Sequence, residues 1–100
     1  LPLTLYFRPS FQRSLKRLGA EQQRTIGRIL EALQVYYAAD GNLVAAQQCA
    51  PRFFYKQLRK PYSEAGVDRH LRVIILREDD KGIAVLAGNH DHIRRFLAGT

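Results

Sequence analysis

The chain has 100 residues, 46% of them hydrophobic, and its 16 lysines and arginines against nine aspartates and glutamates give a formal charge of +7. This length suits one domain, spanning residues 1–100, with a modest core, and the lone Cys49 excludes an internal disulfide. No apolar run approaches the roughly 20 residues of a membrane span, so we expect a soluble, cytoplasmic protein whose charge favours a polyanion or an acidic partner.

The first part of the chain predicts one strand and two helices. Apolar and polar residues alternate over residues 3–7, as in a strand with one face on the core, and Pro9 ends the run. Ser10 is a candidate N-cap for a first helix that Gly19 closes. The apolar spacing then predicts a second, longer helix from about residue 20 to residue 39. We expect the two helices to form a hairpin with a short connection.

The middle of the chain has weaker patterns. Residues 43–51 show no clear period and indicate a loop or a short helical turn. Residues 52–58, RFFYKQL, are predicted as a strand because of their aromatic composition. The following KPYSEAG is rich in turn residues and is interpreted as a loop.

The strongest pattern begins at residue 67. Residues 67–77 alternate and then become apolar, EDDKG supplies turn residues, and residues 83–87 form a second apolar run, so this region predicts an antiparallel β-hairpin. Period-two alternation places Leu71, Val73 and Ile75 on one face and His70, Arg72, Ile74 and Leu76 on the other. We expect helices to bury the first face, and the second face to be covered near the turn but open around His70 and Arg72.

A last helix is predicted over residues 89–97, with Asn89 or Asp91 as its cap. The complete order is a strand, two helices, three strands and a helix. It predicts an α+β fold in which an antiparallel sheet of about four strands carries the helical hairpin on one face and a basic site on the other.

The hairpin and the last helix together hold all three histidines. If the turn centres near residues 80–81, antiparallel pairing brings His70 and Arg72 beside residues 88–91, which include His90. RNA cleavage by 2′-hydroxyl attack needs two proton transfers, for which imidazoles suit neutral pH. It also needs a cation on the phosphate, for which a guanidinium is suited.

The candidate catalytic residues are therefore His70, Arg72, His90 and Asp91, the last as a group that orients an imidazole. The candidate RNA-binding residues are Lys56, Arg59, Lys60, Arg69 and His92. Each has a structural alternative: an exposed strand histidine, an arginine packed over Ile74 or paired with Glu64, a helix cap, or a solvated helix residue. No metal or cofactor is expected, since neither a zinc pattern nor a nucleotide-binding glycine motif is present.

The element order, Arg72 in the LRVIIL strand, and GNHDHIRRF after the final strand resemble the RelE/ParE superfamily of bacterial type II toxins over nearly the whole chain. For a RelE-like member, the resemblance implies an endoribonuclease that cuts mRNA on the ribosome. For a ParE-like member, it implies a non-enzymatic inhibitor of DNA gyrase. An inactive member kept as an interaction module is a third alternative.

By position, Arg72 matches the strand arginine that binds phosphate in RelE-like nucleases, and His90 stands at the basic or histidine position after the last strand. Phe96 stands where RelE has a tyrosine, and Ser63 and Ala65 stand where RelE has paired lysines. GNHD is similar to the Gly-x-His pattern of YafQ-type relatives, whose acid and base are histidines. The resemblance favours the nuclease.

The resemblance also implies a partner, because toxins of both kinds are held inactive by a cognate antitoxin. Ile74 and Leu76 lie on the predicted exposed face of the sheet, which is poorly suited to remain bare. We therefore expect the antitoxin to cover this face with an acidic, amphipathic segment.

Overall fold

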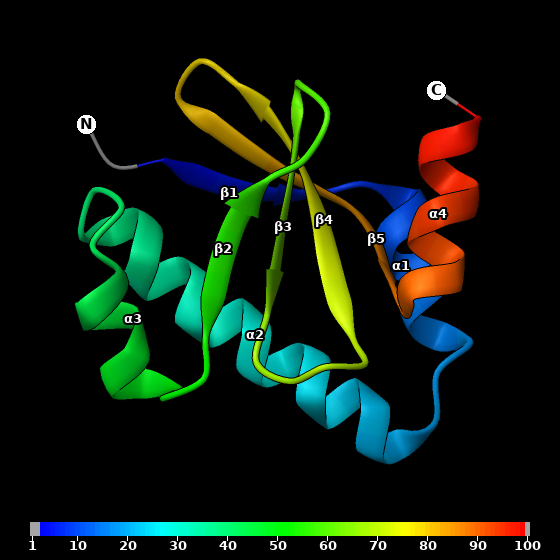
Figure 1. The fold of residues 1–100 in the computed structure, drawn as a ribbon, viewed down its shortest axis with the longest axis horizontal. Helices are drawn as coiled ribbons and strands as arrows, with labels where there is room; N and C mark the ends of the chain where they lie inside the picture. The colour runs from blue at the N-terminus through cyan, green and yellow to red at the C-terminus, as the bar shows by residue number, and fades with distance from the viewer. Residues whose placement is uncertain (1–2, 100) are drawn as a thin grey trace.

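The computed structural model of the protein describes residues 3–99, which form five strands and four helices (Figure 1). Strand β1 (Thr4–Phe7) is followed by the helices α1 (Pro9–Lys16), α2 (Ala20–Ala38) and α3 (Leu43–Cys49). Strands β2 (Phe54–Gln57), β3 (Tyr62–Gly66), β4 (Arg72–Glu78) and β5 (Lys81–Gly88) precede the last helix, α4 (His90–Ala98). Leu1 and Pro2, which precede the predicted first strand, and Thr100 lie outside the described residues.

The strands form one sheet in the order β1-β5-β4-β3-β2, in which β1 pairs parallel to β5 and the other pairs are antiparallel. The predicted α+β class is confirmed. The count of about four strands was wrong by one, because β3 lies in the segment interpreted as a loop. Its turn-forming residues are held extended by pairing with β2 on one side and β4 on the other.

One face of the sheet is covered by α1, α2 and α3 (Figure 1). Val73 and Ile75 of β4 are fully buried there, in one cluster with Ile26, Ile29 and Leu33 of α2. Each such side chain contributes about 1.5–3 kcal/mol by leaving water. The predicted long helix is confirmed with its end one residue earlier. The helix α3, which Asn42 caps, stands where a loop or a short helical turn was expected.

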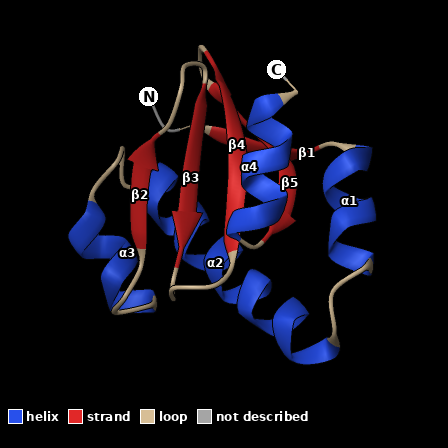
Figure 2. Ribbon diagram, turned by 45° about the vertical axis from the view of Figure 1, so that its right-hand side comes forward, coloured by secondary structure: helices blue, strands red, loops and turns tan. Residues whose placement is uncertain are grey.

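The other face is covered by α4, which Figure 2 shows in front of β4 and β5 with α2 behind the sheet. Ile74 and Leu76 are 0% and 8% exposed, and they pack in a second cluster with Ile93 of α4. The expected cover near the turn is therefore present, and the expectation that Ile74 and Leu76 lie exposed for a partner was wrong. The alternation of the two faces was right, but the final helix supplies the cover that we assigned to a partner.

The predicted hairpin is confirmed as β4 and β5, with the turn at Asp79 and Asp80. Asp79 has a φ of 47°, a left-handed conformation that aspartate tolerates better than most residues. The pairing places Arg72 opposite Gly88. The first strand of the hairpin is shorter than predicted, because residues 67–71 form the connection from β3 rather than part of β4.

Helix α1 supports β5 where β1 ends. The β1–β5 ladder stops at the pair Phe7–Ala84, and beyond it two serines of α1 bond to the backbone of β5. Ser10 Oγ donates to the carbonyl oxygen of Val85 at 2.8 Å, and Ser14 Oγ accepts from the amide of Ala87 at 2.9 Å. The end of β5, which leads into α4, is thereby held in place.

No helix in residues 3–99 combines the length and the apolar character that a membrane span requires.

Candidate functional site

Arg72, the first residue of β4, is buried rather than open to solvent as predicted. It is 8% exposed, and its Nη1 donates to the carbonyl oxygens of Asp68 at 2.5 Å and Leu71 at 2.9 Å. The guanidinium carbon lies 4.6 Å from the centre of the Phe54 ring, a cation–π contact. Its Nε has no hydrogen-bond partner among the described residues, and it lies 3.8 Å from Glu64 Oε1.

Glu64 of β3 was expected only as a possible ion-pair partner of Arg72 and not as a site residue. It is 5% exposed and lies between two cations, since Lys56 Nζ is 3.6 Å from the same Oε1. A carboxylate buried to this degree is rare unless it is paired with a positive charge. The sequence signal for Glu64 was period-two spacing, which places Tyr62, Glu64 and Gly66 on one face of a strand. It was missed because this segment was interpreted as a loop.

Strand pairing places these groups on one face, because directly paired residues of antiparallel strands point to the same side. The pairs that define this site face are Phe54–Gly66, Lys56–Glu64, Glu64–Ile74 and Arg72–Gly88. Gly66 permits the close packing, since a Cβ there would lie 2.7 Å from Phe54 Cε1 and 3.1 Å from Arg72 Cδ. Helix α4 covers Ile74 on this face. It leaves Lys56 of the edge strand β2 uncovered, with 64% of its side chain exposed.

Asp68 orders the connection between β3 and β4. Its Oδ1 accepts hydrogen bonds from the amides of His70 at 2.9 Å and Leu71 at 3.0 Å, which forms a local turn. Partial burial alone would raise the pKa of Asp68, but these two amide donors, together with the positive charge of His70 and Arg72, outweigh it, and the pKa is lowered. This turn positions the carbonyl oxygen that holds Arg72.

His70 lies away from the site face. It is exposed and belongs to the connecting loop, because β4 begins two residues later. It lines a hollow of about 550 Å³ whose other wall is the first turns of α2, including Arg24 and Arg28. Within residues 3–99, no hydrogen bond or ion pair joins His70 to His90 or His92. In the structure Arg72 therefore lies opposite Gly88, as predicted. The two predicted catalytic histidines, His70 and His90, have no hydrogen bond to each other in residues 3–99.

The first turn of α4 carries the other two histidines. Asn89 caps the helix, because its Oδ1 accepts from the His92 amide at 3.1 Å, while its own amide donates to His92 Nδ1 at 3.2 Å. Since Nδ1 is an acceptor, the neutral ring carries its proton on Nε2. Asp91, the alternative cap, is an exposed residue of the first turn, as is His90.

His92 is the histidine that packs on the end of the β4–β5 pair. A Cβ on Gly88 would lie 2.8 Å from His92 Cβ and 2.9 Å from its Nδ1, so only glycine leaves room for this ring. Gly88 is the partner of Arg72. His92 is also exposed, as the alternative interpretation of a solvated helix residue expected. Its contact with Gly88 was not predicted, because helical spacing does not reveal contact with a preceding strand.

The remaining predicted RNA-binding residues are dispersed. Arg59 and Lys60 are exposed in the turn between β2 and β3, which lies at the Leu76 end of β4. Leu76 is four residues along the strand from Arg72, a separation of about 13 Å. Arg69 is exposed in the loop beside Asp68. Of this predicted set, Lys56 and His92 are therefore the two with a contact to the residues that surround Arg72.

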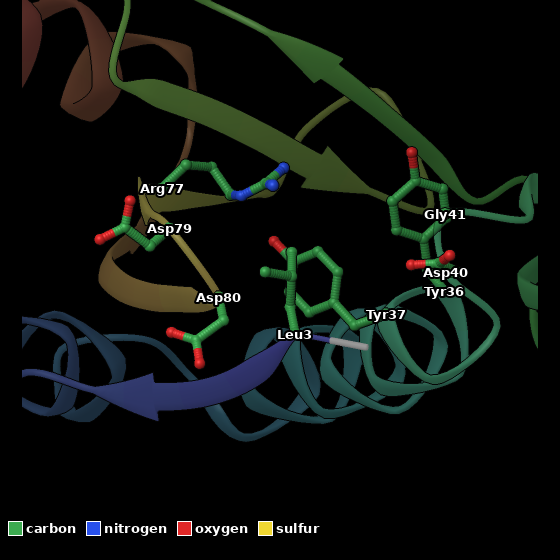
Figure 3. A pocket seen from close by; sticks show the side chains of 8 residues that line it. All are labelled: Leu3, Tyr36, Tyr37, Asp40, Gly41, Arg77, Asp79 and Asp80. Carbon is green, nitrogen blue, oxygen red and sulfur yellow. The ribbon is translucent and has the colours of Figure 1, made fainter. Parts of the chain in front are cut away.

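A separate cavity of about 410 Å³ lies at the hairpin turn, at the other end of β4 (Figure 3). Arg77 reaches over Tyr37 and donates through Nη1 to Tyr55 Oη at 3.3 Å, and the Tyr37 and Tyr55 hydroxyls are 2.9 Å apart. Burial, followed by the hydrogen bond to Tyr55, raises the pKa of Tyr37. These contacts join α2 to β2 and β4, so we interpret the tyrosine group as structural.

No protein-family model matches the chain, and no curated protein matches it. A chain in the crystal structure of the E. coli DinJ–YafQ toxin–antitoxin complex superposes with a TM-score of 0.66 at 12% identity, covering 93% of this chain and 98% of that one.

Two further solved structures are similar over the same extent. A chain of the RelB–RelE antitoxin–toxin complex from Methanococcus jannaschii has a TM-score of 0.62 at 17% identity and covers 92% of this chain and 98% of that chain. A copper-bound mutant toxin from Helicobacter pylori has a TM-score of 0.60 at 20% identity, with 91% and 98% covered. The protein therefore has the fold of the RelE and YafQ toxins of toxin–antitoxin systems, which confirms the predicted RelE/ParE-like architecture.

Proposed function

We propose that the protein is the toxin of a type II toxin–antitoxin system and cleaves mRNA, with the ribosome presenting the substrate. The observation that carries this proposal is the buried Arg72–Glu64 pair, with exposed Lys56 beside it and His92 at the end of the same strand pair. The 2′-hydroxyl attack on a phosphate requires proton-transfer groups and a cation, and this face holds an imidazole and two cations that a carboxylate orients.

The proposed reaction needs no metal. The 2′ oxygen attacks phosphorus and loses its proton to a base, and the 5′ oxygen leaves with a proton from an acid, so that the products are a 2′,3′-cyclic phosphate and a 5′-hydroxyl. We assign Lys56 and Arg72 to the phosphate charge and Glu64 to the orientation of both. His92 is our choice for the acid: as the imidazolium it would give the proton on Nε2 to the leaving 5′ oxygen, and the Asn89 amide would bond to Nδ1 again once the ring is neutral.

The base is proposed to be His90, with His70 as its alternative. His90 stands on the first turn of α4, two residues before His92. His70 lines the hollow beside α2, so it would act only if the substrate reached that side of the connecting loop. Asp91 is proposed to tune the charge of this turn, and Arg59, Lys60 and Arg69 to contact the RNA backbone away from the reacting phosphate.

The test is cleavage of an mRNA by the purified protein, with and without ribosomes. Replacing His92 or the base with alanine should lower the rate by about 10² to 10⁴, and each variant should remove one limb of a bell-shaped pH profile. Gln12→Ala, an exposed change on α1, serves as the control and should change the rate little. Thermal melting confirms that each variant is folded. Cleavage that persists in a folded variant lacking all three histidines would contradict the proposed chemistry.

One observation favours a second function, inhibition of DNA gyrase without chemistry at a site. Arg72 is bound on several sides and is only 8% exposed, which suits a structural role in a binding protein. If the wild-type protein cleaves no RNA in the presence of ribosomes but blocks supercoiling by gyrase, this alternative replaces the nuclease. A chain that does neither would be an interaction module of the same fold.

A cognate antitoxin is the proposed protein partner under either function, since the DinJ–YafQ and RelB–RelE structures are toxin–antitoxin complexes. The formal charge of +7 suits an acidic partner. Because α4 already buries Ile74 and Leu76, we propose that such a partner acts on exposed Lys56 at the edge of the site face rather than on a bare apolar sheet.

A further inference from the structure

Three aromatic residues follow one another at the start of β2, and they do not share one environment. Phe53 is 1% exposed in the cluster under the helices, and Tyr55 stacks on Tyr36 of α2 with ring centroids 4.6 Å apart. Phe54 points to the opposite side, onto the site face, through its pairing with Gly66. Within residues 3–99 it belongs to neither buried apolar cluster, and it is half-buried.

The Phe54 ring is supported by polar groups and backbone instead of apolar side chains. It packs closely on Gly66, where a Cβ would lie 2.7 Å from Cε1, and the Arg72 guanidinium lies 4.6 Å from its centre. Arg72 is itself fixed by two carbonyl oxygens and by Glu64. The ring therefore has a rigid support while part of its surface remains open to solvent.

An exposed cation stands next to this ring on the same edge of the sheet. Lys56 is two residues further along β2, which corresponds to about 6.6 Å, and it points to the same face with 64% of its side chain exposed. An aromatic ring followed by a basic side chain is the combination with which proteins bind single-stranded nucleic acid, the ring under a base and the cation on a phosphate.

We propose that Phe54 is a stacking platform for one unpaired base of the RNA, with Lys56 on a neighbouring phosphate. This inference rests on the proposed nuclease function and adds a substrate-positioning residue to it. Stacking is tolerant of base identity, so the platform would position the strand without reading its sequence. Gly66 is part of this platform, because any side chain there would displace the ring from its support.

The chain contains no tryptophan, so a Phe54→Trp variant carries a single fluorescent reporter at the platform. Tyr6→Trp provides a matched control on the opposite edge strand, since Tyr6 is also an exposed aromatic, 47% exposed, with Lys81 Nζ 5.8 Å from its ring centre. The probe is a short 2′-O-methyl oligonucleotide, which lacks the hydroxyl needed for cleavage. Saturable quenching is expected for Phe54→Trp and none for Tyr6→Trp.

Affinity for the same oligonucleotide is then measured by anisotropy for wild type, Phe54→Leu and Phe54→Tyr. We expect Phe54→Leu to weaken binding by about 5- to 100-fold, the range for loss of one stacked base, and Phe54→Tyr to bind as wild type does. Wild-type binding with an unchanged Phe54→Leu affinity and no Trp quenching would overturn the platform and leave the nuclease proposal standing. If the wild-type protein bound neither this oligonucleotide nor mRNA on the ribosome, the nuclease proposal would fall and the platform with it.

Discussion

At the start of β4 a guanidinium group is buried among three kinds of partner: backbone carbonyl oxygens, an aromatic face and a carboxylate. A buried charge is tolerated only where such partners replace water. The planar, forked shape of arginine allows it to contact all three at once. In this arrangement Arg72 Nε lies 3.8 Å from Glu64 Oε1 and has no hydrogen-bond partner in the part of the chain that the structure describes.

We expect Arg72→Lys to lower the free energy of unfolding by roughly 2 kcal/mol, the scale of lost hydrogen bonds from a charged group, because one ammonium cannot reach every partner. Urea denaturation measures the change. Arg69→Lys is the matched control, since Arg69 is exposed in the adjoining loop, and it should change stability by less than about 0.5 kcal/mol. Equal stability of the two variants would show that the contacts of Arg72 contribute little.

Asp68 makes stability depend on pH. Its pKa is lowered in the folded protein, so its contribution is fully present above the ordinary carboxyl pKa of about 3.9 and is lost as the pH falls through the lower folded value. Asp68→Asn should therefore flatten the loss of stability below about pH 4, because its amide oxygen still accepts from the backbone but does not titrate. Thermal melts from pH 2 to pH 7 measure the slope, and identical slopes for wild type and variant would refute the assignment.

At the scale of elements, the end of β5 is completed by a helix. Beyond Ala84 the outer backbone groups of β5 have no strand beside them, and Ser10 and Ser14 of α1 take that place. A helix hydroxyl that bonds to a strand 73 residues away has no signature in local spacing, so only the packing of α1 revealed it.

Ser14→Ala should destabilise the protein by about 1–3 kcal/mol, since the buried amide of Ala87 would lose its acceptor. Gln12→Ala, an exposed change on the same helix, is the control and should have an effect near zero. Chemical denaturation gives both values. Hydrogen exchange at Ala87 adds a local readout, because its amide should exchange faster in Ser14→Ala even if the global effect is small.

At the scale of the molecule, the sheet separates two kinds of surface. One face is buried under α1, α2 and α3, and the other is divided between the apolar cover of α4 and the charged group around Arg72. In the charged group, Lys56 is the exposed cation that a polyanion or an acidic partner could contact.

If RNA is held there, its affinity should fall with salt by roughly 0.7 log units in the binding constant per log unit of salt for each phosphate neutralised on a single strand. Lys56→Gln should lower that slope by about one such contact. Lys16→Gln on α1, which covers the opposite face, should leave the slope unchanged. Titrations at several salt concentrations measure it, and a slope that both variants lower equally would indicate diffuse charge instead of a defined site.

Local pattern determined much of this protein. The alternation in the LRVIIL strand, the two aspartates of the turn and the apolar spacing of the helices predicted the hairpin, α1, α2 and α4, because period and turn chemistry depend on neighbouring residues. The same pattern placed Arg72 near residues 88–91. Tertiary structure decided the rest. Pairing with β2 and β4 made a strand of the polar β3 segment and brought Glu64 close to Arg72. Packing placed α4 over Ile74, so that His92 rather than His70 contacts the end of the β4–β5 pair. These contacts join residues far apart in the chain, whose approach depends on the closing of the whole sheet and leaves no local period to read.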